Sequence, residues 1–357
     1  MSDVLEIRAG SRALTKIRDE GLPQSSIDVM LGASGGPKWF VLSGLDKALI
    51  GEYFKDRKQP LNLLGTSAGA WRFSCYAQKN ALEAHHRFEQ GYLLTEYSAE
   101  PDAEEVSRKC RVLIRDMLGN SGAGEVVSNA IMRFNLIAVK SRGLTKSEAN
   151  WKQMAGLGLA ATGNLISRKT LGAFFTRVLF HHPDADAPFY GMDNLPTQRV
   201  SLSEDNILDA IMASGSIPLV MEGVRDIAGS PKGVYRDGGV IDYHFDMAFP
   251  QGDGLTLYPH FYSRMVPGWF DKSLKWRKPA IEHCDQLVMV SPSESFVSKL
   301  PYGKIPDRTD FKHFSFDDRV KYWKQVIEES DRLGEAFLEA VATDKIRQKI
   351  KPFSSSD

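Results

Sequence analysis

The sequence predicts an α/β fold built on a mostly parallel central sheet. Two consecutive segments, 26–50 and 60–78, each run from an apolar strand through a glycine turn into a helix. Such repeated units place parallel strands side by side through right-handed crossovers. The composition agrees, because 42% of the 357 residues are hydrophobic, as expected for a globular chain with a large core. Sites in this architecture lie at the carboxyl ends of the strands, so we expect function near the two turns.

The first elements follow that order along the chain. Apolar residues within 7–18 predict a short helix, or an extended entry followed by one. Residues 26–36 predict a buried strand that runs into glycines, and the segment after Pro37 has apolar residues at helical spacing. Residues 61–64 predict a second strand, which ends in the tight turn 65–69 before another helix.

The remaining elements are predicted in less detail. From about 80 to 180 the pattern is mostly helical, which indicates a cap-like excursion from the sheet. Beyond it we predict β structure near 177–204, a helix over 204–216, strands over 233–245 and 283–293, and a C-terminal helical region at about 317–350. No repeat or linker divides the chain, so residues 1–357 are predicted to form a single domain.

Charge and cysteine content exclude several classes of protein. Forty-five basic and 45 acidic residues cancel, so no overall field attracts nucleic acid or an anionic membrane. Cys75, Cys110 and Cys284 form neither a disulfide framework nor a zinc motif, which favours a reducing, cytoplasmic compartment. The N-terminal segment lacks the apolar core of a signal peptide, and the most apolar stretch, 154–166, is too short to span a bilayer.

The stretch "NLLGTSAGA" (62–70) places Ser67 between a predicted strand and a predicted helix. In a nucleophile elbow this sharp turn forces strained backbone angles on the serine, and glycines two residues before and after it, here Gly65 and Gly69, relieve the crowding. The amides at the start of the following helix favour a developing oxyanion. Ser67 is therefore the candidate nucleophile, with an ordinary glycine-rich turn as the alternative.

The stretch "GASGGPKW" (32–39) is the candidate oxyanion hole. The amides of Gly35 and Gly36 have no side chains beside them and can point at a carbonyl oxygen. Lys38 either adds positive potential or is an ordinary solvated lysine of a first helical turn. The alternative for this segment is a phosphate-binding loop, but Trp39 stands where that motif requires serine or threonine.

Asp237 is the candidate base. It stands at the end of a predicted strand, and Gly238 and Gly239 let the backbone turn tightly and bring the carboxylate close to another loop. The alternative is a plain Asp-Gly-Gly turn. None of the eight histidines stands in a recognisable triad motif.

Together these motifs resemble the patatin-like phospholipases, lipid acyl hydrolases with a Ser-Asp dyad. The resemblance covers about residues 25–80 and 205–245, through Ser34-Gly35-Gly36-Pro37-Lys38, Gly65-Thr66-Ser67-Ala68-Gly69 and Asp237-Gly238-Gly239, with "ASGSIP" (213–218) before the last. It implies a three-layer α/β/α fold, Ser67 as nucleophile, Asp237 as its base and Gly35 and Gly36 as backbone donors. No cofactor or metal is implied.

The sequence departs from the family pattern at three places. The family's glycine run begins with glycine where this chain has Ser34, and a further glycine usually follows the basic residue where this chain has Trp39. After the aspartate motif the family often has asparagine and proline, whereas "VIDYHFD" stands here. These departures leave the dyad intact and leave the acyl-chain and head-group preference open.

Three segments bear on substrate binding. Residues 80–180 and 257–279 are candidates for lining an acyl pocket or meeting a lipid surface, and the latter interleaves tryptophans with lysines; an ordinary surface loop is the alternative. We expect 154–166 to pack closely through its small residues, with a mobile lid as the alternative. Asp242, His244 and Asp246 alternate but nothing completes a metal site.

The sequence thus predicts a cytoplasmic serine esterase that acts on lipids or small esters, with peripheral membrane contact as an open possibility and no nucleic acid partner. Two alternatives remain. An acyltransferase uses the same serine, although the related malonyl transacylases carry histidine where this chain has Thr66. A non-catalytic lipid-binding protein retains the fold, but Ser67 and Asp237 argue against it.

Overall fold

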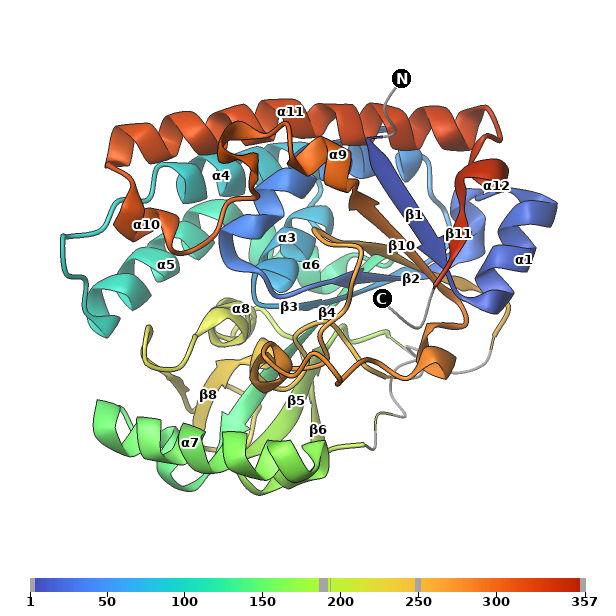
Figure 1. Ribbon diagram of the computed structural model, residues 1–357. Coiled ribbons are helices and arrows are strands. Elements are labelled where there is room, and N and C mark those ends of the chain that lie inside the picture. The colour runs from blue at the N-terminus through green and yellow to red at the C-terminus, as the bar shows by residue number, and fades with distance from the viewer. Residues whose placement is uncertain (1–3, 186–191, 193, 248–251, 354–357) are drawn as a thin grey trace.

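A twisted sheet of eleven strands runs through the computed structural model, which describes residues 4–185, 192, 194–247 and 252–353 (Figure 1). The main path has the order β11-β1-β10-β9-β2-β3-β4-β5-β6, and β8 pairs with β4 and with β7 beside it. The strands are β1 (Leu5–Ala9), β2 (Ile27–Gly32), β3 (Leu61–Thr66), β4 (Met132–Ser141), β5 (Phe175–His181), β6 (Thr197–Ser201), β7 (Val224–Arg225), β8 (Val234–Asp237), β9 (Leu255–Pro259), β10 (Leu287–Pro292) and β11 (Lys351–Pro352).

The centre of the sheet is parallel, as the sequence predicts. Strands β10, β9, β2, β3 and β4 run in one direction, whereas β1 runs against β10 and both β5 and β8 run against β4. Gly32 at the end of β2 pairs with Gly65 near the end of β3. The two glycine turns singled out in the sequence therefore lie side by side at one edge of the sheet.

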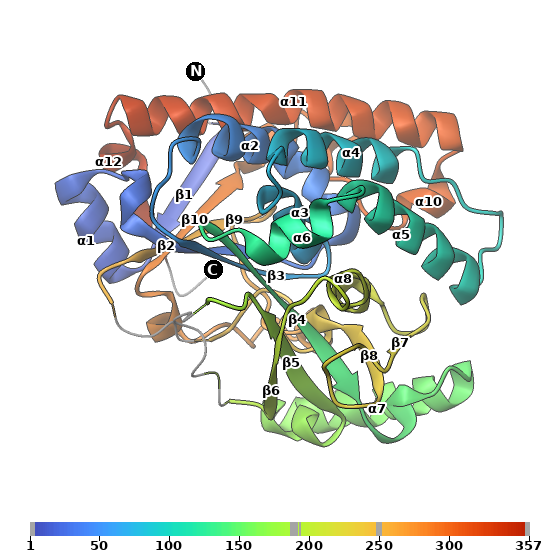
Figure 2. The ribbon, with the colours of Figure 1, turned by 180° about the vertical axis from the view of Figure 1, so that it is seen from behind.

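Helices flank this sheet, which confirms the predicted fold class. They are α1 (Ser11–Glu20), α2 (Ser43–Ala48), α3 (Ala68–Tyr76), α4 (Ala81–Leu93), α5 (Ala103–Leu118), α6 (Gly122–Ser128), α7 (Asn150–Ile166), α8 (Ile207–Gly215), α9 (Glu294–Val297), α10 (Asp310–His313), α11 (Phe316–Ala342) and α12 (Ile346–Lys349). Short 3₁₀ segments, including η2 (Gly36–Leu42), η4 (Gly143–Lys146), η5 (Arg168–Ala173), η6 (Gly238–Val240) and η7 (Trp269–Asp271), connect them. Both views place α11 along one side of the molecule and α7 along the opposite side (Figures 1 and 2).

The long helix α11 falls where the sequence predicts the C-terminal helical region. The side chain of its N-cap, Ser315, accepts a hydrogen bond from the amide of Asp318, which satisfies one of the free donors of the first turn. A Cβ atom on Gly334 would lie 2.5 Å from the carbonyl oxygen of Gly44. Glycine thus lets α11 lie against α2 at backbone contact distance.

The region 80–180 is less helical than predicted, because β4 and β5 interrupt it. Strand β4 is a central strand: β5 pairs with it on one side, and β3 and then β8 pair with successive parts of it on the other. Its residues 134–139 are all buried, so polar positions do not alternate with apolar ones. A short apolar run of this kind cannot be distinguished from a buried helix by periodicity. The same reason explains why β9, another buried strand, was missed.

Candidate active site

Ser67 occupies the turn between β3 and α3, in a conformation that L residues rarely adopt, with φ 52° and ψ −127°. A Cβ atom on Gly65 would lie 2.5 Å from the amide nitrogen of Ala70, and one on Gly69 would lie 2.0 Å from the carbonyl oxygen of Gly32. Both contacts are shorter than atoms tolerate. The two glycines are therefore required by the close approach of α3 to β2 and β3, and the strained turn presents the serine side chain at the end of the strand.

Asp237 reaches Ser67 from the opposite direction along the sheet. Strand β4 continues past the end of β3, where Thr66 pairs with Ile137, and β8 runs back along this extension until Asp237 pairs with Ala138. The side chains of Asp237 and Ser67 line the same small cavity, and the Ser67 hydroxyl is close enough to favour the charged form of Asp237 and so to lower its pKa. Residues far apart in the sequence are thus brought together by an antiparallel strand, not by the parallel arrangement that the sequence suggested.

Short contacts fix the Asp237 loop in place. The amide of Gly239 donates to Asp237 Oδ1 at 2.7 Å, and the amide of Asp237 donates to the carbonyl oxygen of Ser216 at 3.0 Å. A Cβ atom on Gly238 would lie 2.2 Å from the carbonyl oxygen of Ile137, and one on Gly239 would lie 2.2 Å from Ser34 Oγ. Only glycine fits at either position. The two glycines are therefore required by packing against Ile137 and Ser34, which a plain Asp-Gly-Gly turn would not need.

The environment of Asp237 makes its carboxylate more basic. Burial raises the pKa of Asp237 to about 6, although the Gly239 amide, the Ser67 hydroxyl and the nearby cations Arg308 and Lys272 favour the charged form. Desolvation therefore outweighs the favourable contacts. A carboxylate with this pKa is a far better proton acceptor at neutral pH than an ordinary one.

Gly35 and Gly36 line the same cavity as the two side chains. Gly36 has φ 54°, and a Cβ atom on Gly35 would lie 2.5 Å from the ring of Phe261. Neither amide donates to a protein acceptor among the described residues. Two free N–H groups beside a serine can bind an anionic oxygen.

The loop that carries these glycines is tied to the elbow. Ser34 Oγ lies 2.8 Å from Thr66 Oγ1, and the Thr66 hydroxyl donates to the carbonyl oxygen of Asp242 at 3.2 Å. The amide of Ser34 donates to the carbonyl oxygen of Tyr243 at 3.2 Å. Ser34, which departs from the family's glycine, thus joins the first glycine turn to the loop after Asp237.

Ser214 supports the elbow in a way that the sequence did not reveal. The backbone amide of Ser67 donates to Ser214 Oγ at 3.0 Å, which supports the strained conformation of this residue. The Ser214 hydroxyl in turn donates to the carbonyl oxygen of Ile137 at 2.7 Å. Ser216, two residues later, accepts the amide of Asp237. The stretch "ASGSIP" therefore holds the backbone at both Ser67 and Asp237, and its only signal in the sequence was the family resemblance.

Three cations surround the cavity. Lys38, Lys272 and Arg308 line it, and Asp237 is its only carboxylate lining residue in the described part of the chain. Burial, and then the neighbouring Arg308 and Lys38, lower the pKa of Lys272 to about 7. Burial also lowers the pKa of Lys38. The sequence pointed to Lys38 and to the segment 257–279, which contains Lys272, but it did not point to Arg308, which stands in no motif.

The aromatic and basic segment 257–279 is only partly a surface loop. Leu257 and Tyr258 belong to β9 and are buried in the sheet. Trp269 and Phe270 pack against a small apolar cluster, whereas Trp276 is exposed. The segment thus contributes a strand to the sheet and, through Trp269 and Lys272, part of the cavity wall, whereas Trp276 extends into solvent.

The alternating acidic and histidine residues after Asp237 make structural contacts. The Asp242 carboxylate binds the guanidinium of Arg177 through two bonds of 2.7 Å, and both side chains are buried. His244 Nδ1 accepts the amide of Val266, and Asp246 pairs with His283 at 2.7 Å. No cluster that could hold a metal ion occurs among the described residues.

We expect Asp242→Asn to lower the free energy of unfolding by about 3–5 kcal/mol, because it leaves the buried Arg177 charge unpaired. Urea unfolding measures this effect. The exposed pair Arg332–Glu329, at 3.0 Å, supplies the control, since Glu329→Gln should cost less than about 1 kcal/mol. Equal losses in the two variants would contradict a buried structural role for Asp242.

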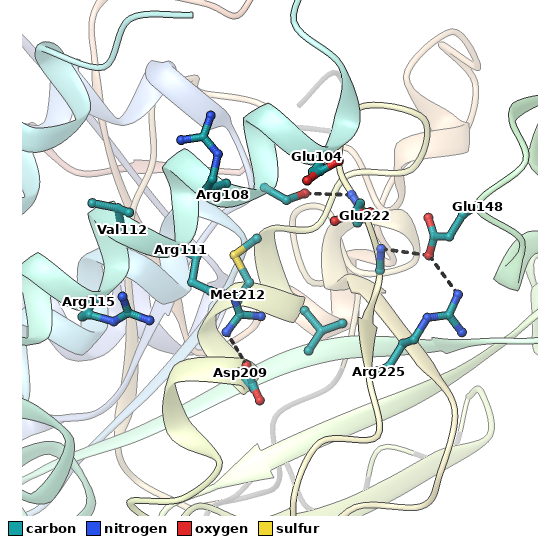
Figure 3. Close-up of a pocket in the computed structure, with 13 residues that line it drawn as sticks. Glu104, Arg108, Arg111, Val112, Arg115, Glu148, Asp209, Met212, Glu222 and Arg225 are labelled. Atoms are coloured by element: carbon teal, nitrogen blue, oxygen red, sulfur yellow. Dashed lines mark hydrogen bonds and ion pairs between the residues drawn. The ribbon is translucent and has the colours of Figure 1, made fainter.

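A second, wider cavity lies between α5, α8 and β7 (Figure 3). Two ion pairs lie in its wall, between Arg111 and Asp209 at 2.6 Å and between Arg225 and Glu148 at 3.7 Å. Ser107, its serine, accepts the amide of Glu222 and donates to the carbonyl oxygen of Ala103. This cavity is larger than the one at Ser67, but it holds no serine beside a free base.

Comparisons with known proteins add little to this geometry. No family model matches the chain, and no curated protein matches its sequence. Among solved structures, VipD from Legionella pneumophila is similar over 99% of this chain and 75% of its own, with 12% identity and a TM-score of 0.36. Human GIVD cytosolic phospholipase A2 is similar over 97% of this chain and 67% of its own, with 10% identity and a TM-score of 0.33.

Proposed function

We propose that this protein is a serine esterase of the patatin-like type that hydrolyses carboxylic esters of lipids through a Ser67–Asp237 dyad. The observation that carries the proposal is a strained serine that lines the same cavity as a buried carboxylate whose pKa is raised to about 6. The free amides of Gly35 and Gly36 in the same cavity support it. Each part is what acyl transfer from an ester requires.

The proposed reaction has two halves. Asp237 accepts the Ser67 proton as Ser67 Oγ attacks the ester carbonyl, and the amides of Gly35 and Gly36 hold the resulting oxyanion. As the bond to the alcohol breaks, Asp237 returns the proton to the departing oxygen, which leaves an acyl-serine. Water then attacks this ester with Asp237 as base, and the free acid leaves with Ser67 restored.

The cations of the cavity favour an ester that carries a negative charge, as in phospholipase or lysophospholipase substrates. Lys38, Lys272 and Arg308 outnumber Asp237 among the lining side chains. The positive charges of Arg308 and Lys38 repel that of Lys272, and an anionic group bound among them would offset this repulsion. The cavity is small, about 50 Å³, so long acyl chains would extend beyond it or require its aromatic wall to move.

Labelling with a fluorophosphonate probe tests the enzyme assignment. We expect covalent labelling of the wild type and none of Ser67→Ala; an unlabelled wild type would favour the non-catalytic lipid-binding alternative. Adding an acceptor alcohol to the ester assay separates the remaining two functions. Free acid as the main product supports hydrolysis, whereas a transferred ester in preference to free acid would support an acyltransferase.

Lys272→Met is expected to lower kcat/KM for an anionic ester about tenfold to a hundredfold, the usual loss for one hydrogen bond to a charged group. A neutral ester of the same shape should be affected far less. Because the pKa of Lys272 is about 7, the wild-type preference for the anionic ester should also decline as pH rises through 7. The exposed Lys275 provides the matched control, Lys275→Met. Equal losses on both esters would contradict a charge-recognition role.

A further inference from the structure

Helix α7 presents an apolar face to solvent. Its side chains Trp151, Met154, Leu159, Leu165 and Ile166 are between 54% and 84% exposed. The residues that pack inward are mostly small or polar, namely Gln153, Gly156, Leu157, Ala160 and Asn164. The sequence predicted close packing for 154–166, and this expectation is wrong for Met154, Leu159, Leu165 and Ile166, which face solvent. We call the five exposed side chains the α7 face.

The α7 face offers almost nothing for polar recognition. Residues 149–170 contain three basic residues and no acidic residue. Lys152 lies with its ammonium 5.4 Å from the centre of the Trp151 ring, and the Thr162 hydroxyl already donates to the carbonyl oxygen of Gly158. Glu148, just before the helix, is bound to Arg236 at 2.7 Å. The surface is thus aliphatic and aromatic with positive charge around it.

Both views place α7 at the margin of the molecule, away from the helices of the opposite side (Figures 1 and 2). Its inner side joins the cluster that contains Val240 and Trp269, two residues that also line the Ser67 cavity. In addition, Gln153 Oε1 accepts the amide of Leu219, directly after the lining residue Pro218. Helix α7 is therefore in direct contact with the wall of the candidate active site.

The exposed apolar surface continues beyond the helix. Arg277 donates to the carbonyl oxygen of Asn164 at 2.6 Å and to that of Leu165 at 3.3 Å. This contact fixes Trp276, which is 71% exposed, next to the C-terminal end of α7. Tryptophan side chains thus stand near both ends of the apolar face, an arrangement typical of segments that lie at a membrane interface.

We propose that the α7 face binds the surface of a lipid bilayer that contains anionic lipids. A protein partner normally forms about one hydrogen bond per 100–200 Å² of interface, and the α7 face has few groups that could form one. A bilayer interior requires none, and the exposed Lys152 and Lys169 beside the face match anionic headgroups. This inference goes beyond the proposed function and does not depend on ester hydrolysis.

Vesicle flotation tests the proposal. Vesicles of phosphatidylcholine, with and without phosphatidylglycerol, are incubated with the Ser67→Ala protein, so that no lipid is hydrolysed. We expect binding that increases with phosphatidylglycerol and weakens with salt. Trp151→Ser and Ile166→Ser should each weaken it roughly tenfold, because each removes a large apolar side chain. Leu94→Ser, at a similarly exposed position after α4, is the matched control and should bind as before.

Further measurements keep the result unambiguous. Acyl chains carrying bromine should quench the tryptophan fluorescence of the bound protein, and Trp151→Leu combined with Trp276→Leu should reduce this quenching without abolishing binding.

With Ser67 present, the Trp151→Ser protein should still hydrolyse a soluble ester normally, since Trp151 does not line the dyad cavity. Absence of vesicle binding by the Ser67→Ala protein would overturn the proposal, as would self-association that Ile166→Ser abolishes. Vesicle binding by a protein without Ser67-dependent hydrolysis would overturn only the proposed function.

Discussion

Ser67→Ala is expected to lower kcat/KM for ester hydrolysis by about 10⁴-fold or more, because no other group can form the acyl-enzyme. Hydrolysis that remains would come from the oxyanion donors and from binding alone. The fold should persist, since the Ser67 backbone amide still donates to Ser214 Oγ after the change. Initial rates with a chromogenic ester, over a range of enzyme concentrations, measure the effect.

A second buried serine supplies the control for Ser67. Ser74 lies on α3, donates to the carbonyl oxygen of Trp71 and does not line the cavity. We expect Ser74→Ala to keep its activity. Ser67→Ala with nearly normal activity would exclude the dyad mechanism, whereas similar losses in both variants would indicate a disturbed fold.

Asp237→Asn is expected to have opposite effects on activity and on stability. Hydrolysis should fall by about 10³–10⁴-fold, because asparagine cannot accept the Ser67 proton. In the wild type, kcat/KM should rise with pH through about 6 as the Asp237 carboxylate forms. The residual activity of the variant should lack this step. Measuring kcat/KM from pH 4 to pH 8 checks both statements.

The stability effect follows from the direction of the pKa shift. The pKa of Asp237 rises from 3.8 to about 6 on folding, so the folded state binds the proton more tightly than the unfolded state does. Ionisation of Asp237 therefore destabilises the fold, fully above pH 6 and not at all below pH 4. Asp237→Asn removes this cost, which is at most about 3 kcal/mol.

Urea unfolding of both proteins between pH 4 and pH 8 tests this effect. The difference in unfolding free energy should be near zero at low pH and should grow through the interval between the two pKa values. Asp205→Asn, at an exposed position, controls for the loss of one negative charge. If Asp237→Asn is less stable than the wild type at pH 8, the carboxylate stabilises the fold. That result would contradict the view that ionised Asp237 lowers stability and is present for catalysis.

Local patterns in the sequence were sufficient to predict the elements around the site. Strand β2, strand β3 and the helices that follow them were predicted from apolar runs, glycine turns and Pro37. The glycines at 65 and 69 were predicted from backbone crowding, and the structure contains that crowding. Strands β4 and β9 were not predicted, because a short buried strand carries no periodic signal.

The sequence by itself determined the sharp turns at Ser67, Gly35 and Asp237, because each turn depends on glycines within a few residues. What only the tertiary structure decided is how they meet: β8 runs back along the extension of β4 and places Asp237 beside Ser67. Burial, which raises the pKa of Asp237, and the cations Lys272 and Arg308 also come from distant segments. The physical reason is that turn geometry is a local property of the chain, whereas desolvation and charge proximity depend on which segments pack together.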